Sequence, residues 1–464
     1  MPRLWFWLFA CSTIFTTQLT CIAVAQTTKQ AAPADQTVTP AQNALSQESA
    51  KGALPLEDLR VFTQIYEQIR HNYVDEIDDK TLLEYAIRGM LDKLDPHSAY
   101  LDKSSFDDLQ VHTTGEFGGI GIEVSMEEGI LTVVSPIDDT PADAAGIEAG
   151  DKIIKLDDVL VKGLSLEEAI EKMRGIKGTN INLTLMRENV NAPFNIMITR
   201  DTIKVRSIRH EIIEDHYGYI RIAQFQTRTG IDMISAINEM QKEHDIHGLI
   251  LDLRNNPGGV LQASVEVAGA FLDGHMVVYT EGRNNAMNEE LFASQGDLTQ
   301  DLPLVVLIND GSASASEIVA GALQDHGRAV VLGTRSFGKG SVQTVQPITQ
   351  DKAIKLTTAL YYTPKGRSIQ AQGIVPDINV ERVRVTAIKG RTRISEAELN
   401  GHLSNTKSEE FSRKDRLAEQ QKAESSLQNQ DNQLYEAVNL LKGLSIFNNL
   451  QSLKATPKPA MANN

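Results

Sequence analysis

The chain has 464 residues, which is enough for several domains. Its 61 acidic and 45 basic side chains give a formal net charge of −16, which argues against nucleic acid or an anionic membrane surface as the main partner.

The first 25 residues have the pattern of an export signal. Arg3 precedes an apolar stretch from Leu4 to Ala10, and Ala23-Val24-Ala25 offers a small-residue cleavage site. Serine, threonine and glutamine interrupt the apolar run after Ala10, so we expect a cleaved signal peptide rather than a membrane anchor. The predicted location is therefore the periplasm of a Gram-negative bacterium.

Both cysteines of the chain, Cys11 and Cys21, lie in this leader, so the mature protein has no thiol and needs no disulfide. Residues 26–53 are rich in Gln, Thr, Ala, Pro and Ser and hold few large apolar side chains. Such a segment cannot bury a core, and we expect a flexible linker.

Residues 54–105 carry two apolar stripes at helical spacing, one from Leu59 to Tyr73 and one from Leu82 to Leu94. They predict an N-terminal helical hairpin that ends at Asp95-Pro96. We interpret the stripes as packing surfaces, whose aromatic members could also cover a neighbouring subunit.

Residues 106–204 are predicted to form a compact β-rich module. A glycine-rich start, Gly118-Gly119-Ile120-Gly121-Ile122, leads into a strand. The other expected strands are 130–134, 151–157 and 181–185, and the expected helices are 141–146 and 166–174.

Residues 205–384 alternate strands with helices, which favours an α/β core with parallel strands. Strands are expected at 217–222, 249–253 and 304–308, and helices at 230–243, 258–272 and 314–325. Residues 385–464 form a polar, charged tail, in which Leu434 to Leu444 predicts a short amphipathic helix for assembly or docking.

Ser314 lies where the strand 304–308 ends and the next helix begins, among small residues that would let a substrate backbone approach. The first N–H groups of a helix lack internal partners and carry partial positive charge. The Ala315 N–H could therefore hold a tetrahedral oxyanion formed on attack by Ser314. A second donor would come from the segment 254–259, where glycines let backbone N–H groups approach a ligand.

Lys339 lies between two glycines, 25 residues after Ser314. A serine needs a base to become a nucleophile, and a buried lysine with a lowered pKa can act as one. Gln343 could accept a hydrogen bond from Lys339 and orient it. On a helix the two would be neighbours, but on a strand about 13 Å would separate them, and the apolar residues around Gln343 favour a strand.

Each of these motifs also has a plain structural interpretation. The serines could serve as an ordinary helix N-cap, and Lys339 could lie in a flexible turn. His326 and His275 are interpreted as surface residues. No spaced Cys/His set or His-Glu-x-x-His pair indicates a metal, and we expect no cofactor.

Residues 309–325, 333–343 and 251–259 resemble the three core motifs of the carboxyl-terminal processing (tail-specific) serine peptidases. The resemblance covers residues 54–384. It implies an α/β multidomain protein with a crotonase-like serine peptidase core, an inserted PDZ domain and an N-terminal helical hairpin. The implied roles are Ser314 as nucleophile, Lys339 as general base, Gln343 as its orienting partner, and Ala315 with Gly258 or Gly259 as oxyanion hole.

The resemblance also implies that Gly118, Gly119, Ile120, Gly121 and Ile122 form a PDZ loop that captures a peptide's C-terminal carboxylate, while the peptide adds to the sheet edge. Arg174 resembles a family position that couples peptide docking to alignment of the active site, and its plain alternative is a solvated arginine at a helix end. The implied partners are proteins with exposed C-termini, a helical-repeat lipoprotein adaptor and further copies of the chain.

Two other functions stay open at this stage. One is an acyl-CoA enzyme on a crotonase-like core, which would need neither an export leader nor Lys339. The other is a catalytically silent PDZ scaffold, which would bind protein tails without cutting them.

Overall fold

The computed structural model describes residues 55–127, 129–384, 399–401, 403, 427–428 and 430–455. The predicted leader and linker, and most of the predicted tail, lie outside these residues. The chain divides into two compact units, Met1–Leu82 and Leu83–Asn464.

The described part of the first unit contains α2 (Leu56–Asn72) and the first turn of α3 (Asp79–Asp92), as the apolar stripes predicted. The two are joined by a hydrogen bond from the Tyr66 hydroxyl to Asp79, at 3.0 Å. Helix α2 has no buried residue, and Leu59, Phe62, Ile65 and Ile69 on its apolar stripe are all exposed. The stripe is thus a surface feature of this chain.

The second unit begins with the rest of α3, β1 (Ala99–Leu101) and α4 (Lys103–Thr114). Helix α4 was not among the elements that the sequence pattern predicted. Asp102 caps it by accepting the N–H of Ser105 at 2.9 Å, and Gly115 ends it with φ 73°.

The β-rich module has the predicted elements and four further strands. Its helices are α5 (Pro141–Ala144) and α6 (Leu166–Met173), and its strands are β2 (Glu116–Gly119), β3 (Ile122–Glu127), β4 (Ile130–Pro136), β5 (Lys152–Leu156), β6 (Val159–Leu160), β7 (Asn180–Met186), β8 (Phe194–Thr199) and β9 (Asp201–Lys204). The main sheet has the order β3-β4-β5-β7-β8, and β2 pairs with β9. Strand β3 therefore lies at an edge of the sheet, where an extended peptide could pair with it.

The α/β core is built on a six-stranded sheet with the order β10-β11-β12-β15-β16-β19. These strands are β10 (Ile208–Ile213), β11 (Tyr217–Ile222), β12 (Gly248–Asp252), β15 (Leu304–Ile308), β16 (Val330–Gly333) and β19 (Ile378–Asn379). All pairs after β10–β11 are parallel, as the alternation of strands and helices predicted. Both faces of such a sheet must be covered, which explains the apolar runs Leu249–Leu251 of β12 and Leu304–Ile308 of β15.

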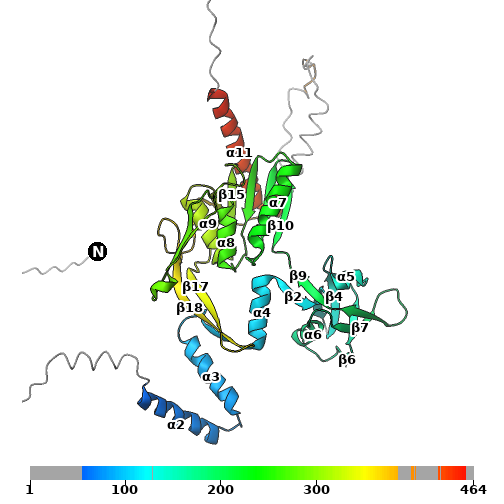
Figure 1. The fold of residues 1–464 in the computed structure, drawn as a ribbon. Coiled ribbons are helices and arrows are strands. Elements are labelled where there is room, and N and C mark those ends of the chain that lie inside the picture. Colours follow the sequence, from blue (N-terminus) through cyan, green and yellow to red (C-terminus); the bar gives the residue numbers. More distant parts are fainter. Residues whose placement is uncertain are drawn as a thin grey trace, which may run out of the picture. The chain divides into compact units, whose positions relative to one another are not determined.

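Helices α7 (Thr229–Glu243), α8 (Leu261–Gly269) and α9 (Ala315–Asp325) pack on one face of this sheet. On the other face, Ile250, Val305 and Leu307 form a second core with Val438 and Leu441 of α11 (Asn432–Ala455), the red helix in Figure 1. Helix α11 is longer than the predicted 434–444. Its described apolar side chains cover the chain's own sheet, so the prediction of a helix for assembly or docking missed its packing role.

The helix predicted at 258–272 begins three residues later than expected, at Leu261. Gly258 and Gly259 instead have φ values of 100° and 142°, and Gly259 pairs with Phe225 across an isolated bridge. A Cβ on Gly259 would lie 2.0 Å from the Phe225 carbonyl oxygen, so only glycine fits there.

A second sheet contains β13 (Met276–Gly282), β14 (Glu290–Phe292), β17 (Ser341–Pro347) and β18 (Ala353–Tyr362), with β1 at one edge. Strand β18 is the pivot, because it pairs with β1, β13 and β17. This sheet brings the segment after α3 next to the segment that carries Gln343.

Candidate active site

The site lies at the carboxyl ends of β12 and β15, two neighbouring parallel strands. The loop after each strand is joined to the other by side-chain hydrogen bonds. Asn309 accepts the N–H of Asn255 at 2.8 Å, and the Ser312 hydroxyl donates to the Leu253 carbonyl at 2.8 Å. Loops at this edge of an α/β sheet commonly carry the functional groups.

Three serines in the second loop differ in their surroundings. Ser312 and Ser316 are fully buried, and their hydroxyls donate to the carbonyls of Leu253 and Asn256. Ser314 is partly exposed, so of the three its hydroxyl is the one open to a substrate. Its backbone has φ 56° and ψ −115°, a strained conformation for a residue with a side chain, and such strain gathers at functional sites.

The glycine loop approaches Ser314 closely. A Cβ on Gly258 would lie 2.7 Å from the Ser314 Cβ and 3.0 Å from the Ala315 nitrogen. The Gly258 N–H donates to Asn256 Oδ1 at 2.9 Å, whereas the N–H groups of Gly259 and Ala315 find no acceptor among the described residues. Of the two glycines predicted as oxyanion donors, Gly259 is therefore the one with a donor to offer.

Glu317 holds the serine and lysine segments together. Its Oε2 accepts the backbone N–H of Ser314 at 2.8 Å and that of Lys339 at 2.9 Å. Its Oε1 accepts the N–H of Gly338 at 2.7 Å and the hydroxyl of Ser336 at 2.6 Å. Burial raises the pKa of Glu317, and these hydrogen bonds oppose the shift. One carboxylate thus fixes the backbones of Ser314 and Lys339 beside each other.

The Lys339 side chain is partly buried, and burial lowers the pKa of its amine. Lys355 lowers this pKa further, while Asp95 and Glu317 act in the opposite direction. The amine makes no hydrogen bond or ion pair with a described residue, Ser314 included. The structure therefore brings the two residues to one site and gives the amine the predicted pKa direction, without a direct bond between the two side chains.

Tyr361 of β18 contacts both residues, with its hydroxyl against the Lys339 carbonyl and the Ser314 side chain. Burial raises its pKa well above the usual tyrosine value, so the phenol stays neutral.

Gln343 lies on strand β17, in the extended conformation that its neighbours indicated. Its amide nitrogen donates to Ser341 Oγ at 2.9 Å, and it has no hydrogen bond with Lys339. The Thr357 hydroxyl beside Gln343 donates to Asp95 at 3.0 Å. Burial alone would raise the pKa of Asp95, but hydrogen bonds from Ser98, His97 and Thr357 lower it to about 2.

The sequence motifs did not indicate a role for Glu317, Tyr361 or Asp95. The position of Glu317, three residues after Ser314, is the spacing of a capping box and could have indicated a bond to the Ser314 N–H. Tyr361 and Asp95 reach the site through the pairing of β18 with other strands, which no local pattern reveals.

The predicted tail-binding loop joins β2 to β3. The N–H groups of Ile120 and Gly121 find no acceptor among the described residues, and Gly121 has φ 83°. A Cβ on Gly121 would lie 2.3 Å from the Thr140 side chain, so this loop needs glycine there.

Arg174 follows α6 and is not a free helix-end arginine. Its guanidinium pairs with Asp108 of α4 at 2.9 Å and lies 5.5 Å from the centre of the Phe117 ring. The Nε of Arg174 is buried without a partner among the described residues. Arg174 therefore links the β-rich module to the helix that precedes it.

His326 and His275 are exposed, as expected for surface residues, and His326 is bonded to the Met276 carbonyl. Among the described residues, no cluster of three or more His, Cys, Asp or Glu side chains could hold a metal. No helix in the described part of the chain combines the length and apolarity needed to span a bilayer.

Comparison with known proteins assigns the chain to a family. Residues 216–380 match peptidase family S41, residues 118–198 match the PDZ domain, and residues 15–105 match the N-terminal domain of the activating protease CtpB. A carboxy-terminal-processing protease of Bartonella bacilliformis is 49% identical over 351 residues, which are 75% of this chain and 81% of that protein. The chain belongs to the carboxy-terminal processing proteases.

A second carboxyl-terminal-processing protease, from a Picosynechococcus species, is 39% identical over 298 residues, which are 63% of this chain and 71% of that one. A solved structure, the photosystem II D1 C-terminal processing protease, is 29% identical and has a TM-score of 0.42, with 69% of this chain and 92% of that chain covered.

Membership of the carboxy-terminal processing proteases confirms the predicted α/β peptidase core with an inserted PDZ domain. The protein is a serine-type peptidase, and the acyl-CoA enzyme considered above is excluded. The β-rich module of strands β3 to β8 is the PDZ domain.

Proposed function

We propose that this protease is an endopeptidase that selects protein substrates by their C-terminal tails and cuts them with Ser314 and Lys339. The observation that carries the assignment is the single Glu317 oxygen that accepts the N–H groups of both residues. The exposure of Ser314, beside two buried and bonded serines, supports it as the nucleophile.

In the proposed reaction, Ser314 Oγ attacks the scissile carbonyl carbon while its proton passes to the neutral Lys339 amine. The N–H groups of Ala315 and Gly259 stabilise the oxyanion. The tetrahedral intermediate then breaks its C–N bond, and Lys339 returns the proton to the leaving amine. Water hydrolyses the acyl-enzyme by the same route, with Lys339 again as base.

The Lys339 amine must approach Ser314 Oγ for this reaction. Rotation of the Lys339 side chain supplies this approach, because Glu317 already holds the two backbones. Gln343 would then support the amine from β17, the role that the resemblance implies for it.

We further propose that the PDZ domain captures the substrate's terminal carboxylate with the N–H groups of the loop Gly118–Ile122, while the tail pairs with β3. The free N–H groups of Ile120 and Gly121 support this proposal. The Arg174–Asp108 contact would pass the effect of tail binding to the core through α4.

The experiment compares one peptide substrate with a free C-terminal carboxylate and with a C-terminal amide. Because hydrogen bonds to a charged group contribute about 1.5–3 kcal/mol, the amide should lower kcat/KM by roughly 10- to 100-fold. In an Arg174→Ala chain the tail should still bind, but the free carboxylate should no longer raise kcat. Equal rates for both peptides in the wild type would contradict tail selection.

Export to the periplasm with loss of residues 1–25, and assembly into a homo-oligomer, are also proposed. The apolar, exposed side of α2 supports assembly, because such a surface is commonly covered by a partner. Native mass spectrometry of protein from a periplasmic extract should find chains that begin at Gln26, in complexes of more than one copy. A monomer that retains its leader would contradict both proposals. A helical-repeat lipoprotein adaptor stays a prediction from the resemblance alone.

A further inference from the structure

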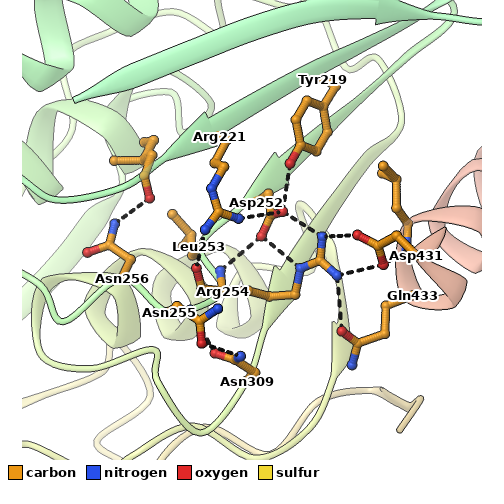
Figure 2. A network of polar contacts seen from close by, with 12 residues as sticks. Tyr219, Arg221, Asp252, Leu253, Arg254, Asn255, Asn256, Asn309, Asp431 and Gln433 are labelled. Carbon is orange, nitrogen blue, oxygen red and sulfur yellow. Dashed lines mark hydrogen bonds and ion pairs between the residues drawn. The ribbon is translucent and has the colours of Figure 1, made fainter. Parts of the chain in front are cut away.

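The oxyanion loop begins at Arg254, and the side chain of Arg254 reaches the start of α11 (Figure 2). Its Nη1 and Nη2 donate to the two carboxylate oxygens of Asp431 at 2.8 and 2.7 Å, in a fork-to-fork pair. Gln433 accepts a further hydrogen bond from Nη1 at 3.1 Å. The two residues of the pair are 177 positions apart in the chain.

Arg254 is nearly buried and is held on its other side by Asp252, the last residue of β12. Asp252 accepts from the Arg254 N–H at 2.9 Å, from Nε at 3.0 Å and from Nη2 at 2.7 Å. Arg221 donates to the Arg254 carbonyl at 3.2 Å. The backbone and the guanidinium of Arg254 are therefore both fixed, and Figure 2 shows the two carboxylates on either side of the guanidinium.

Two residues further on, Asn256 connects this loop to the residues on both sides of Ser314 by hydrogen bonds. Its carbonyl accepts the Ser316 hydroxyl and the Ala313 N–H, both at 3.0 Å, and its side chain accepts the Gly258 N–H at 2.9 Å. A shift of Arg254 would therefore move the segment that ends at Gly259.

Asp431 both pairs with Arg254 and caps helix α11. Its Oδ1 also accepts the N–H of Leu434 at 3.0 Å, which caps the first turn of α11. Helix α11 itself is held on the sheet by the apolar contacts of Leu434, Val438 and Leu441. The packed helix α11 thus fixes the position of Asp431, and the ion pair with Asp431 in turn fixes the guanidinium of Arg254.

We infer that Asp431 is a positioning residue for catalysis, which holds the oxyanion loop in place through Arg254 and makes the C-terminal helix part of the active-site support. The inference rests on the proposed function, in which the Gly259 N–H stabilises the oxyanion. Hydrogen bonds to an oxyanion act in the transition state, so loosening this loop lowers kcat and leaves KM nearly unchanged.

The test uses the full chain with Asp431→Asn, which keeps an oxygen for the helix cap but removes the charge and one acceptor from Arg254. The matched control is Glu214→Gln. Glu214 pairs with Lys442 of α11 at 2.8 Å and has a side chain 31% exposed, against 30% for Asp431, but it does not contact Arg254. Both variants remove an ion pair that ties the same helix to the core.

We expect Asp431→Asn to lower kcat roughly tenfold with KM within about twofold, because misplacing a catalytic group by a fraction of an ångström has effects of this order. Hydrogen exchange in residues 253–260 should be faster in Asp431→Asn than in the wild type. Glu214→Gln should leave both readouts unchanged, even if the thermal midpoints of the two variants fall alike.

An unchanged kcat in Asp431→Asn would overturn the inference. An equal fall of kcat in both variants would also overturn it and would indicate a general effect on stability. If the wild type itself proves unable to cut peptides, the proposed function fails and the exchange measurement decides alone. Faster exchange in Asp431→Asn only would then still support the link to Arg254, and equal exchange would reject it.

Discussion

Replacing Ser314 with alanine is expected to lower kcat for peptide cleavage by about 10⁴-fold or more, because no other hydroxyl can form the acyl-enzyme. The fold should persist, since the hydrogen bond that joins Ser314 to Glu317 comes from the Ser314 backbone N–H, which alanine keeps. Steady-state kinetics, with mass spectrometry of the new C-termini, measure the loss. Tail binding should remain, so Ser314→Ala should capture substrates without cutting them.

Ser316→Ala is the matched control for the serine replacement. Its hydroxyl is buried and donates to the Asn256 carbonyl, so its loss should cost about 1 kcal/mol of stability and leave kcat within roughly tenfold of the wild type. If Ser316→Ala lost activity as completely as Ser314→Ala, or if Ser314→Ala stayed active, the choice of nucleophile would be wrong. A fully folded wild type that binds tails but cuts no peptide would indicate a catalytically silent PDZ scaffold instead.

Replacing Lys339 with methionine, which keeps an unbranched side chain and removes the amine, should also lower kcat by about 10⁴-fold. Only the neutral amine can accept the Ser314 proton, so the wild-type rate should rise with pH up to the pKa of Lys339. Because burial lowers that pKa, the midpoint should fall below the usual lysine value of about 10.4. Activity of Lys339→Met within tenfold of the wild type would exclude this base.

Lys355→Met provides the control for the charge of Lys339. Lys355 helps to lower the Lys339 pKa, so its removal should shift the pH–rate profile to higher pH while the maximal rate is kept. The pH dependence of stability provides a second test of the lowered Lys339 pKa. The unfolded chain binds more protons than the folded one between the lowered and the usual lysine pKa, so wild-type stability should rise with pH there. The Lys339→Met chain should lack that part of the pH dependence.

The elements with strong periodicity were predictable from the sequence. The apolar runs Leu249–Leu251 of β12 and Leu304–Ile308 of β15, with the stripe of α9, locate the core sheet and the helix that follows Ser314. The serine and lysine motifs were recognisable because each is continuous in the chain. Their relation in space was not, since it depends on the Glu317 carboxylate, whose polar contacts leave no trace in a hydrophobic pattern.

Elements defined by distant pairing were harder to predict. Strand β18 pairs with β1, β13 and β17, of which β1 and β13 are distant from it in the sequence. This pairing places Tyr361 and the segment at Asp95 at the site. Helix α11 was predicted in part, but its assignment to a docking role missed the sheet face that it covers. That face is created by alternate residues of β12 and β15, whose apolar neighbours on both sides hide the alternation.

The packing of α11 on the sheet has a consequence for how the protease is made. Leu441 stands near the end of the chain, yet it helps to cover Ile250 and Leu307, which are synthesised long before it. During synthesis, this side of the core therefore stays open to water until α11 has been made. A nascent chain, or one clipped before Asp431, would lack the contact that holds Arg254, so its kcat should be lower than that of the chain with α11 in place.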